Sequence, residues 1–539
     1  MTTLRYPFAA LAGLGFALGC AGAAAPLAPR PNIVLIVADD MGYSDVGCFG
    51  SEISTPHIDR LAREGLRFTQ FYNVTRCSPS RAAMLSGVYS QQAGLGEVPE
   101  YAAPIGGPGY LAHLSDRCVT IAETLRSTGY ATYHSGKWHL GRERPHWPID
   151  RGFDRSTALI DCCSNFFGDP EASEERKPAS RRERYAIDEQ LWRPPLDGYY
   201  STDWFGENAA RMIREHDTAK PFFLYLAFTA PHWPLQARPE DVAKFHGRYD
   251  AGWDEIRRRR FERMRELGLL DPRWQLSRRE GTAPDWKTLD AAKRADWARR
   301  MEIYAAMIAV MDENIGRVLT ALETRGVADN TLVFFLSDNG ATEENPNRGK
   351  PGAALGSRDS YHGYGLGWAN VSNTPFRRYK HWVHEGGIST PLLARWPKGI
   401  ARPGTSYPHP AHVIDLMATA VELSGARHPK EFRGQPIVPL EGRSLAPAFR
   451  GASAPIHDEP IFWEHQGNAA VRHGRWKLVR AEDGPGAWEL YDMDVDRTET
   501  TNLAVQYPER VREMRAQFET WAARAQVRWP WPLAPYKLR

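Results

Sequence analysis

Short apolar runs rich in β-branched and aromatic residues recur along the chain, separated by segments with helical periodicity. Runs of this kind are typical of strands buried on both faces of a sheet. Their alternation with helices predicts an α/β fold with a large mixed, mostly parallel sheet flanked by helices. We expect strands at residues 32–38, 130–134, 222–228, 331–337 and 391–396, and the clearest helices at 55–64, 291–324 and 413–423.

The pattern of the sequence changes after about residue 455. Four short runs separated by glycine-containing turns predict an antiparallel meander, and a helical pattern follows them. We therefore expect a catalytic domain at 31–455 and a smaller C-terminal α+β domain at 456–539. The Arg-rich segment 238–290 is expected to be a helical insertion whose charges form a solvated face. The four predicted strands are 461–464, 469–472, 476–480 and 488–492, and the helix is 508–525.

The charge of the chain is nearly balanced. Lys and Arg total 68 against 65 Asp and Glu among 539 residues, a formal net charge of +3. Such a balance argues against binding to nucleic acid, but it leaves room for a locally basic pocket that attracts an anionic substrate.

The N-terminal residues 1–25 are typical of a secretory signal peptide. Arg5 precedes an apolar, small-residue-rich run that could be cleaved after Ala23 or Ala25. Alternatively, Cys20 could carry a lipid, because the preceding residues loosely resemble a lipoprotein signal. No later segment has ~20 uninterrupted apolar residues. We expect a periplasmic or secreted chain, without a transmembrane segment once it is mature.

The chain has six cysteines. An exported protein permits disulfides, and the four that remain after Cys20 and Cys77 are set aside allow three connectivities. Their spacing does not suggest a zinc site. These four are Cys48, Cys118, Cys162 and Cys163.

Cys77 begins the segment Cys77-Ser78-Pro79-Ser80-Arg81. Pro79 suits the first turn of a helix, which would place Cys77 just before a helix N-terminus that favours an anion. Arg81, one turn later, could reach back toward the same point. For Cys77 considered alone, a buried or disulfide-bonded cysteine beside a capped helix is the simpler interpretation.

Two pairs of polar residues follow predicted strands. Asp39 and Asp40 come after 32–38, and Asp338 and Asn339 come after 331–337. The carboxyl ends of strands are where α/β sheets usually bind ligands. Three carboxylates and an amide oxygen are hard ligands suited to Ca²⁺ or Mg²⁺. Each pair alone could be a turn, but two such pairs in one chain favour a metal site.

Further candidates lie in three loops. In an extended segment Lys137 and His139 would point to one side. There the ammonium could neutralise an anion and the imidazole could orient a nucleophile. His232, between Pro231 and Pro234, is held in a stiff segment suited to proton donation. Lys380 begins the run that ends at Ile388. The simpler alternative for such lysines is a solvated loop.

The Cys77–Arg81 segment, followed by Leu85-Ser86-Gly87, resembles the signature of the type I, formylglycine-dependent sulfatases of the alkaline phosphatase superfamily. Other segments match in the same order, and several resemble bacterial arylsulfatases in particular. The resemblance extends over nearly all of the chain after residue 30. It departs at Ser86, commonly Thr, and at Ser389, commonly Arg. Cys162 and Cys163 lie in a region that faces substrate in those relatives.

The resemblance implies hydrolysis of an aryl sulfate or a sulfated carbohydrate, with release of inorganic sulfate. It implies that a formylglycine-generating maturation enzyme oxidises Cys77 and that each active site holds one Ca²⁺. The implied metal ligands are Asp39, Asp40, Asp338, Asn339 and the residue formed from Cys77. The implied catalytic residues are Cys77, Arg81, Lys137, His139, His232 and Lys380.

Two alternatives remain open at this level. Phosphonate monoester and phosphodiester hydrolases share the fold and the motif, so the site could act on phosphorus esters. With an unmodified Cys77, the chain could instead be a non-catalytic binder of sulfated glycans.

Overall fold

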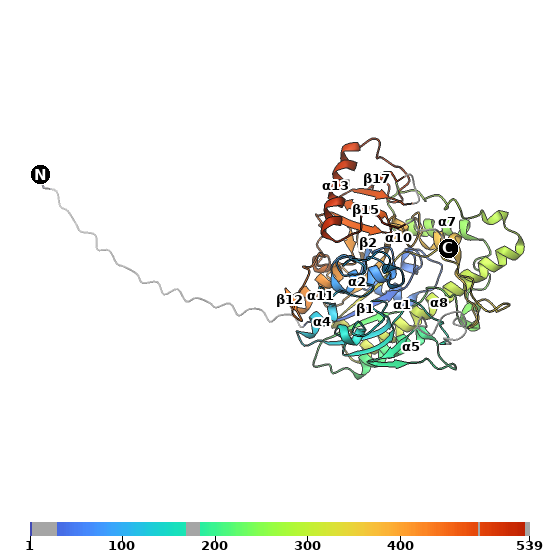
Figure 1. Cartoon of the computed structure of the whole chain (residues 1–539), viewed down its shortest axis with the longest axis horizontal. Helices are drawn as coiled ribbons and strands as arrows, with labels where there is room; N and C mark the ends of the chain where they lie inside the picture. The colour runs from blue at the N-terminus through green and yellow to red at the C-terminus, as the bar shows by residue number, and fades with distance from the viewer. Residues whose placement is uncertain (3–29, 169–183, 483–485, 534–539) are drawn as a thin grey trace.

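The computed structural model describes residues 1–2, 30–168, 184–482 and 486–533. A large sheet of 11 strands forms the centre of the molecule, and a four-stranded sheet lies beside it (Figure 1). The strand order of the large sheet is β10-β2-β9-β8-β1-β7-β3-β4-β5-β6, and β11 also pairs with β2. Its central strands are β8 (Thr331–Ser337), β1 (Asn32–Ala38), β7 (Phe222–Ala227), β3 (Ala131–Lys137) and β4 (Arg155–Leu159).

The five central strands run parallel to one another. On one side β9 (Ser389–Arg395) is antiparallel to both β8 and β2 (Leu66–Tyr72). On the other side β5 (Tyr185–Ile187) and β6 (Gln190–Trp192) add antiparallel edge strands. The short strands β10 (Thr405–Tyr407) and β11 (Ala411–His412) pair in parallel with β2. The expected mixed, mostly parallel sheet is therefore confirmed.

Helices cover both faces of the large sheet because β1 is apolar on both sides. Ile36 belongs to the core shared with α1 (Pro56–Arg63), α5 (Ser201–Glu215) and α8 (Ala291–Thr324). Leu35 belongs to the opposite core, shared with α2 (Cys77–Ser86), α4 (Ile121–Arg126) and α11 (Asp415–Ser424). Successive side chains of a strand point to opposite faces, so a continuous apolar run fills both cores.

The C-terminal sheet is an antiparallel meander, as expected. It consists of β14 (Ile461–His465), β15 (Asn468–His473), β16 (Trp476–Arg480) and β17 (Trp488–Asp492). Helix α13 (Pro508–Arg524) packs on it through Phe518 and Trp521. In Figure 1 this unit lies next to β2. Lys477 of β16 makes ion pairs of 2.8 Å with Glu385 and Glu499, all three side chains being buried.

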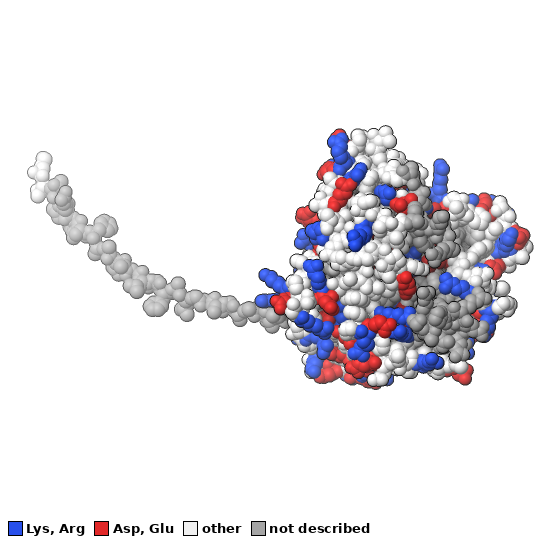
Figure 2. All heavy atoms as spheres, viewed as in Figure 1, with Lys and Arg blue, Asp and Glu red and all other residues white. Residues whose placement is uncertain are grey.

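The Arg-rich segment is only partly solvated, so the expectation that its charges form a solvated face was wrong. Helix α7 (Trp253–Glu266) packs on α9 (Gly365–Ser372), and its inner face includes Arg257 and Arg260, which are 5% and 1% exposed. Arg257 donates to the Ser277 carbonyl at 2.6 Å, and Arg260 pairs with Asp45 and Glu52. Elsewhere charges of both signs are interspersed over the surface seen in Figure 2.

Among the described residues, none of the five cysteines forms a disulfide. Cys20 and most of the expected signal peptide, residues 3–25, lie outside the described residues. Within the described part of the chain, no helix combines the length and the apolarity needed to cross a membrane.

Candidate active site

Two neighbouring strands bring the acidic residues together. In the parallel pair of β1 and β8, Ala38 lies opposite Ser337, so Asp39 and Asp338 leave the sheet side by side. The backbone then turns, since Asp40 has a φ of 63° in the left-handed region. Asp39, Asp40, Asp338 and Asn339 are all at most 1% exposed. The structure thus joins the two strand-end pairs, as the sequence predicts.

Lys137 neutralises Asp39 across the sheet. Its ammonium lies 2.6 Å from Asp39 Oδ2, and both side chains are fully buried. Gly136 permits the close approach of β3 to β7, because a Cβ built at its φ of 123° would lie 1.9 Å from the Ala227 carbonyl oxygen. Burial alone would lower the pKa of Lys137, but the attraction of Asp39 prevails and raises it well above its usual range.

Arg81 neutralises Asp338 from the other side. Its Nε and Nη2 each lie 2.8 Å from Asp338 Oδ2, and its Nη1 donates to the Lys137 carbonyl at 3.2 Å. Arg81 lies one turn into α2, whose ten residues are all buried. The sequence predicts Cys77 just before the helix, whereas it is the first helical residue. The helix therefore begins one residue earlier than expected, and Cys77 still lies at its N-terminus.

His139 links Cys77 to a carboxylate that the sequence analysis missed. Its Nδ1 lies 3.4 Å from Cys77 Sγ, and its Nε2 lies 3.2 Å from Glu100 in α3 (Pro99–Ala102). Its φ of 56° is left-handed rather than extended. Burial lowers the pKa of His139, but Glu100 and Cys77 outweigh it and raise that pKa to about 9.

A second thiol, that of Cys162, faces Cys77. Cys77 Sγ, Cys162 Sγ and His139 Nδ1 all lie within 4.8 Å of one another. Lys137 donates to Cys162 Sγ at 3.9 Å. The hydrogen bond from Cys162 and the nearby cations, Lys137 first among them, hold the pKa of Cys77 well below its usual range.

His232 and Lys380 contact Asp40, opposite Asp39. The ammonium of Lys380 lies 2.8 Å from Asp40 Oδ1, and His232 Nε2 lies 3.4 Å from Oδ2. The His232 Nδ1–H donates to the Trp233 carbonyl at 2.6 Å, which leaves Nε2 facing the site. All the site residues expected from the sequence therefore converge on one buried cluster.

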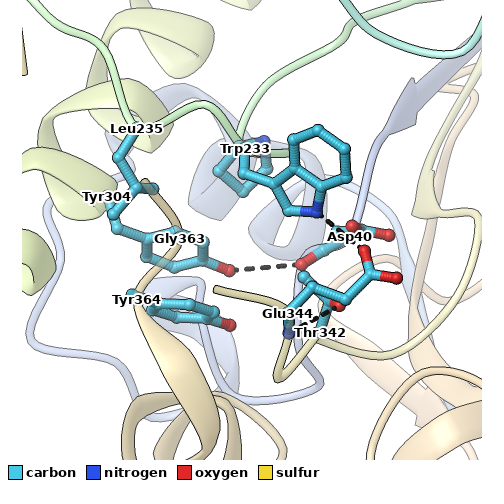
Figure 3. A pocket seen from close by; sticks show the side chains of 9 residues that line it. Asp40, Trp233, Leu235, Tyr304, Thr342, Glu344, Gly363 and Tyr364 are labelled. Carbon is cyan, nitrogen blue, oxygen red and sulfur yellow. Dashed lines mark hydrogen bonds between the residues drawn. The ribbon is translucent and has the colours of Figure 1, made fainter. Parts of the chain in front are cut away.

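A small pocket opens beside Asp40 (Figure 3). Trp233 forms one wall, and its indole N–H donates to Glu344 at 2.7 Å. Glu344 also pairs with Arg76 at 3.3 Å, which ties the pocket wall to the residue preceding Cys77. The pocket is lined by Asp40, Pro231, Trp233, Leu235, Tyr304, Thr342, Glu344, Gly363 and Tyr364.

The cluster fits a hard divalent cation. Asp39 Oδ1 and Asn339 Oδ1 are buried and accept no hydrogen bond from any described residue, although such atoms normally have a partner. Burial and the charge of Asp39 raise the pKa of Asp338 to about 7, and a bound cation would favour its ionised form. Carboxylate and amide oxygens are the ligands that Ca²⁺ and Mg²⁺ prefer.

Comparison with known protein families identifies the chain. The family model for sulfatases matches residues 31–426. This chain belongs to the sulfatase family. A second model, for the C-terminal region of N-sulphoglucosamine sulphohydrolase, matches residues 377–524 of the sulfatase.

Individual sulfatases are similar to this chain over most of its length. The sulfatase is 36% identical over 515 residues to an uncharacterized sulfatase of Schizosaccharomyces pombe, covering 90% of this chain and 92% of that one. It is 36% identical over 439 residues to an arylsulfatase of Klebsiella aerogenes, covering 79% and 93%. The solved structure of Ps i-CgsB with k-i-k-neocarrahexaose is 27% identical, with a TM-score of 0.68 over 92% of this chain and 93% of that one. The chain is therefore a sulfuric ester hydrolase.

Proposed function

We propose that this sulfatase hydrolyses the sulfate ester of a glycan or aryl alcohol with a formylglycine at position 77 and one Ca²⁺. The observation that carries the proposal is the convergence of Cys77, two lysines and the carboxylate cluster within one buried site. Three carboxylates meet three side-chain cations there, so an added divalent cation leaves positive charge for an anionic ester.

Asp39, Asp40, Asp338 and Asn339 would hold the cation through their oxygen atoms. When bound, Ca²⁺ supplies electrostatic stabilisation of the negative charge that develops on the sulfate oxygens. Formylglycine, once formed from Cys77, would supply a hydrated aldehyde as the nucleophile for the sulfate ester. The resemblance to formylglycine-dependent sulfatases supports this modification, which a maturation enzyme would carry out.

The remaining residues would move protons and offset charge. Once Cys77 is oxidised, its thiolate no longer raises the pKa of His139. His139 would then accept a proton at Nδ1 from the group at position 77, while Glu100 stabilises the resulting imidazolium. His232 Nε2 and the Lys380 ammonium lie together at Asp40, where they would protonate the departing alcohol. Arg81 and Lys137 would balance the charge of sulfate and nucleophile.

The indole ring of Trp233, next to His232, supports a ring-bearing alcohol as leaving group. The ring centroids of Trp233 and His232 lie 4.6 Å apart, and the Arg348 guanidinium lies 5.9 Å from the Trp233 ring. An indole with flanking charges is suited to stack on a sugar or aryl ring and to hydrogen bond its substituents. The arylsulfatase and neocarrahexaose-bound relatives support these two substrate classes.

The test is sulfate release by matured protein from a panel of sulfated glycans and aryl sulfates, with Cys77→Ala as the blank. We expect release from at least one member. Faster turnover of aryl phosphates or phosphonates than of aryl sulfates would favour the phosphorus-ester alternative. Mass spectrometry of the peptide containing residue 77 tests the modification, because an unmodified thiol in active protein would refute it.

Export to the periplasm or the medium, directed by residues 1–25, is a further part of the proposal. Cell fractionation and N-terminal sequencing of the mature protein would test it. An intact N-terminus in the cytoplasmic fraction would contradict it.

A further inference from the structure

A second group of side chains with atoms suited to metal ligation lies next to the carboxylate cluster. Cys77 Sγ, Cys162 Sγ and His139 Nδ1 lie within 4.8 Å of one another, and Cys77 and His139 are each 2% exposed. None of these atoms belongs to the carboxylate cluster. Two thiolates and an imidazole are soft ligands that select Zn²⁺ over Ca²⁺.

Glu100 gives His139 the orientation of a zinc ligand. It accepts from His139 Nε2 at 3.2 Å, which leaves Nδ1 facing Cys77 Sγ, 3.4 Å away, where a bound Zn²⁺ would displace the Nδ1 proton. Metal-binding histidines almost always donate their other ring N–H to a carboxylate, carbonyl or water, which fixes the tautomer. The same hydrogen bond to Glu100 would support His139 as a base in sulfate ester hydrolysis. One histidine would therefore serve as a zinc ligand before Cys77 is oxidised and as a base afterwards.

The charge of two thiolates matches a cation of charge +2. Two thiolates and one Zn²⁺ form a neutral unit, so Lys137 keeps its partner Asp39 at 2.6 Å. Lys137 also donates to Cys162 Sγ at 3.9 Å, so its side chain lies at the edge of this group of ligands. Three protein ligands leave a fourth tetrahedral position open to water.

We propose that the chain with an unoxidised Cys77 binds Zn²⁺ through Cys77 Sγ, Cys162 Sγ and His139 Nδ1. Oxidation of Cys77 to formylglycine removes one thiolate, so the matured chain loses this site and keeps only the hard-ligand cluster. That second statement rests on the proposed function, whereas the binding of Zn²⁺ by the unoxidised chain does not.

The experiment uses the full chain made without a maturation enzyme, with its thiol at position 77 verified by mass spectrometry and kept reduced by a phosphine. Cd²⁺ serves as the probe because its bonds to thiolates absorb in the ultraviolet. We expect a saturable absorption band, removed by competing Zn²⁺. Cys162→Ser and Cys77→Ser should each halve the band, while the remote Cys118→Ser should leave it intact.

A positioning variant separates coordination from folding. Glu100→Gln should weaken Zn²⁺ binding about 10–100-fold in calorimetry, because it removes the carboxylate behind the histidine ligand. Its metal-free melting temperature serves as the folding control. No band at saturating Cd²⁺, or a full band in Cys162→Ser, would overturn the proposal. Sulfatase activity plays no part in this readout, so its presence or absence leaves the test unaffected.

Discussion

The Lys137 ammonium lies 2.6 Å from Asp39 Oδ2, and neither side chain reaches solvent. The lysine ends β3 and the aspartate follows β1, with β7 between the two strands. The pair therefore connects the ends of two non-adjacent strands. Because both side chains are buried, the attraction between the two charges is what offsets the cost of removing each of them from water.

Removing one member of this pair should damage both folding and catalysis. Lys137→Ala leaves Asp39 as an uncompensated buried charge, and we expect a loss of about 3–5 kcal/mol in the free energy of unfolding. Sulfate release should fall as well, because one cation near the nucleophile is lost. Denaturant titration and sulfate assays measure the two effects. The double variant Lys137→Met with Asp39→Asn should recover stability but not activity, and recovery of activity would contradict a catalytic role.

Arg81→Lys should lower kcat even though it keeps the positive charge. A lysine ammonium cannot contact Asp338 through two nitrogens while also donating to the Lys137 carbonyl. We expect a decrease of about 10²–10³-fold, typical for the loss of one transition-state-stabilising donor. Tyr225→Phe, which removes only the 3.3 Å contact to Arg81, is the matched control. A kcat for Arg81→Lys near the wild-type value would remove Arg81 from the mechanism.

Removal of the divalent cation should abolish turnover reversibly. Asp39 Oδ1 and Asn339 Oδ1 accept no hydrogen bond from the described residues, so a cation is expected to satisfy them. Exhaustive chelation should eliminate sulfate release, and Ca²⁺ should restore it. Asp40→Asn should raise the Ca²⁺ concentration needed, unlike the exposed Asp116→Asn. Undiminished activity after chelation would exclude a catalytic cation.

Glu385 should be a stability determinant because it joins the two sheets. It pairs with Lys477 and Arg497 at 2.8 Å, and all three side chains are fully buried. Glu385→Gln leaves two buried cations without their shared carboxylate, and we expect a cost of about 3–5 kcal/mol in chemical denaturation. Glu519→Gln, which breaks an exposed i,i+4 pair with Arg515, should cost less than about 1 kcal/mol. Equal losses of unfolding free energy in Glu385→Gln and Glu519→Gln would contradict the stabilising role of Glu385.

His457 should make stability depend on pH. Burial opposes its charged form, but Asp415 at 2.8 Å prevails and raises the pKa of His457 above that of a free histidine. The folded state therefore binds the proton more tightly than the unfolded state does. Its stabilising contribution is fully present below the unfolded pKa of about 6.5 and is lost as pH rises through the higher folded pKa.

Melting temperatures measured from below to above the pKa of a free histidine test the contribution of His457 to stability. His457→Gln should flatten the curve above about pH 6.5, where the native histidine releases its proton. His428→Gln is the matched control, because no carboxylate raises the pKa of His428. The idea fails if the His457→Gln profile keeps the wild-type slope.

Elements with strong local signals could be predicted from the sequence. The bounds of β8 and α8 coincide with the expected 331–337 and 291–324. For α8, Asp290 caps the first turn by accepting from the Lys293 amide at 2.8 Å, which explains the sharp start. Because polar pairs followed two apolar strands, the carboxylate cluster could also be predicted.

Features that depend on tertiary contacts could not be predicted from the sequence. Cys162 and Glu100 reach Cys77 and His139 from distant parts of the chain, and no spacing pattern marks them. The buried Arg257 and Arg260 lie in a helix whose sequence is charged around most of its circumference. Only the packed neighbours decide which arginines are buried.

The parallel order of β8, β1, β7 and β3 sets the dimensions of the site. Neighbouring strands lie about 4.8 Å apart, so the spacing of Asp338, Asp39 and Lys137 follows from a backbone repeat. Amide protons of these central strands should exchange with solvent only when the whole domain opens. The catalytic geometry should therefore persist in every state that remains folded, and selectivity for one ester over another must arise in the loops above it.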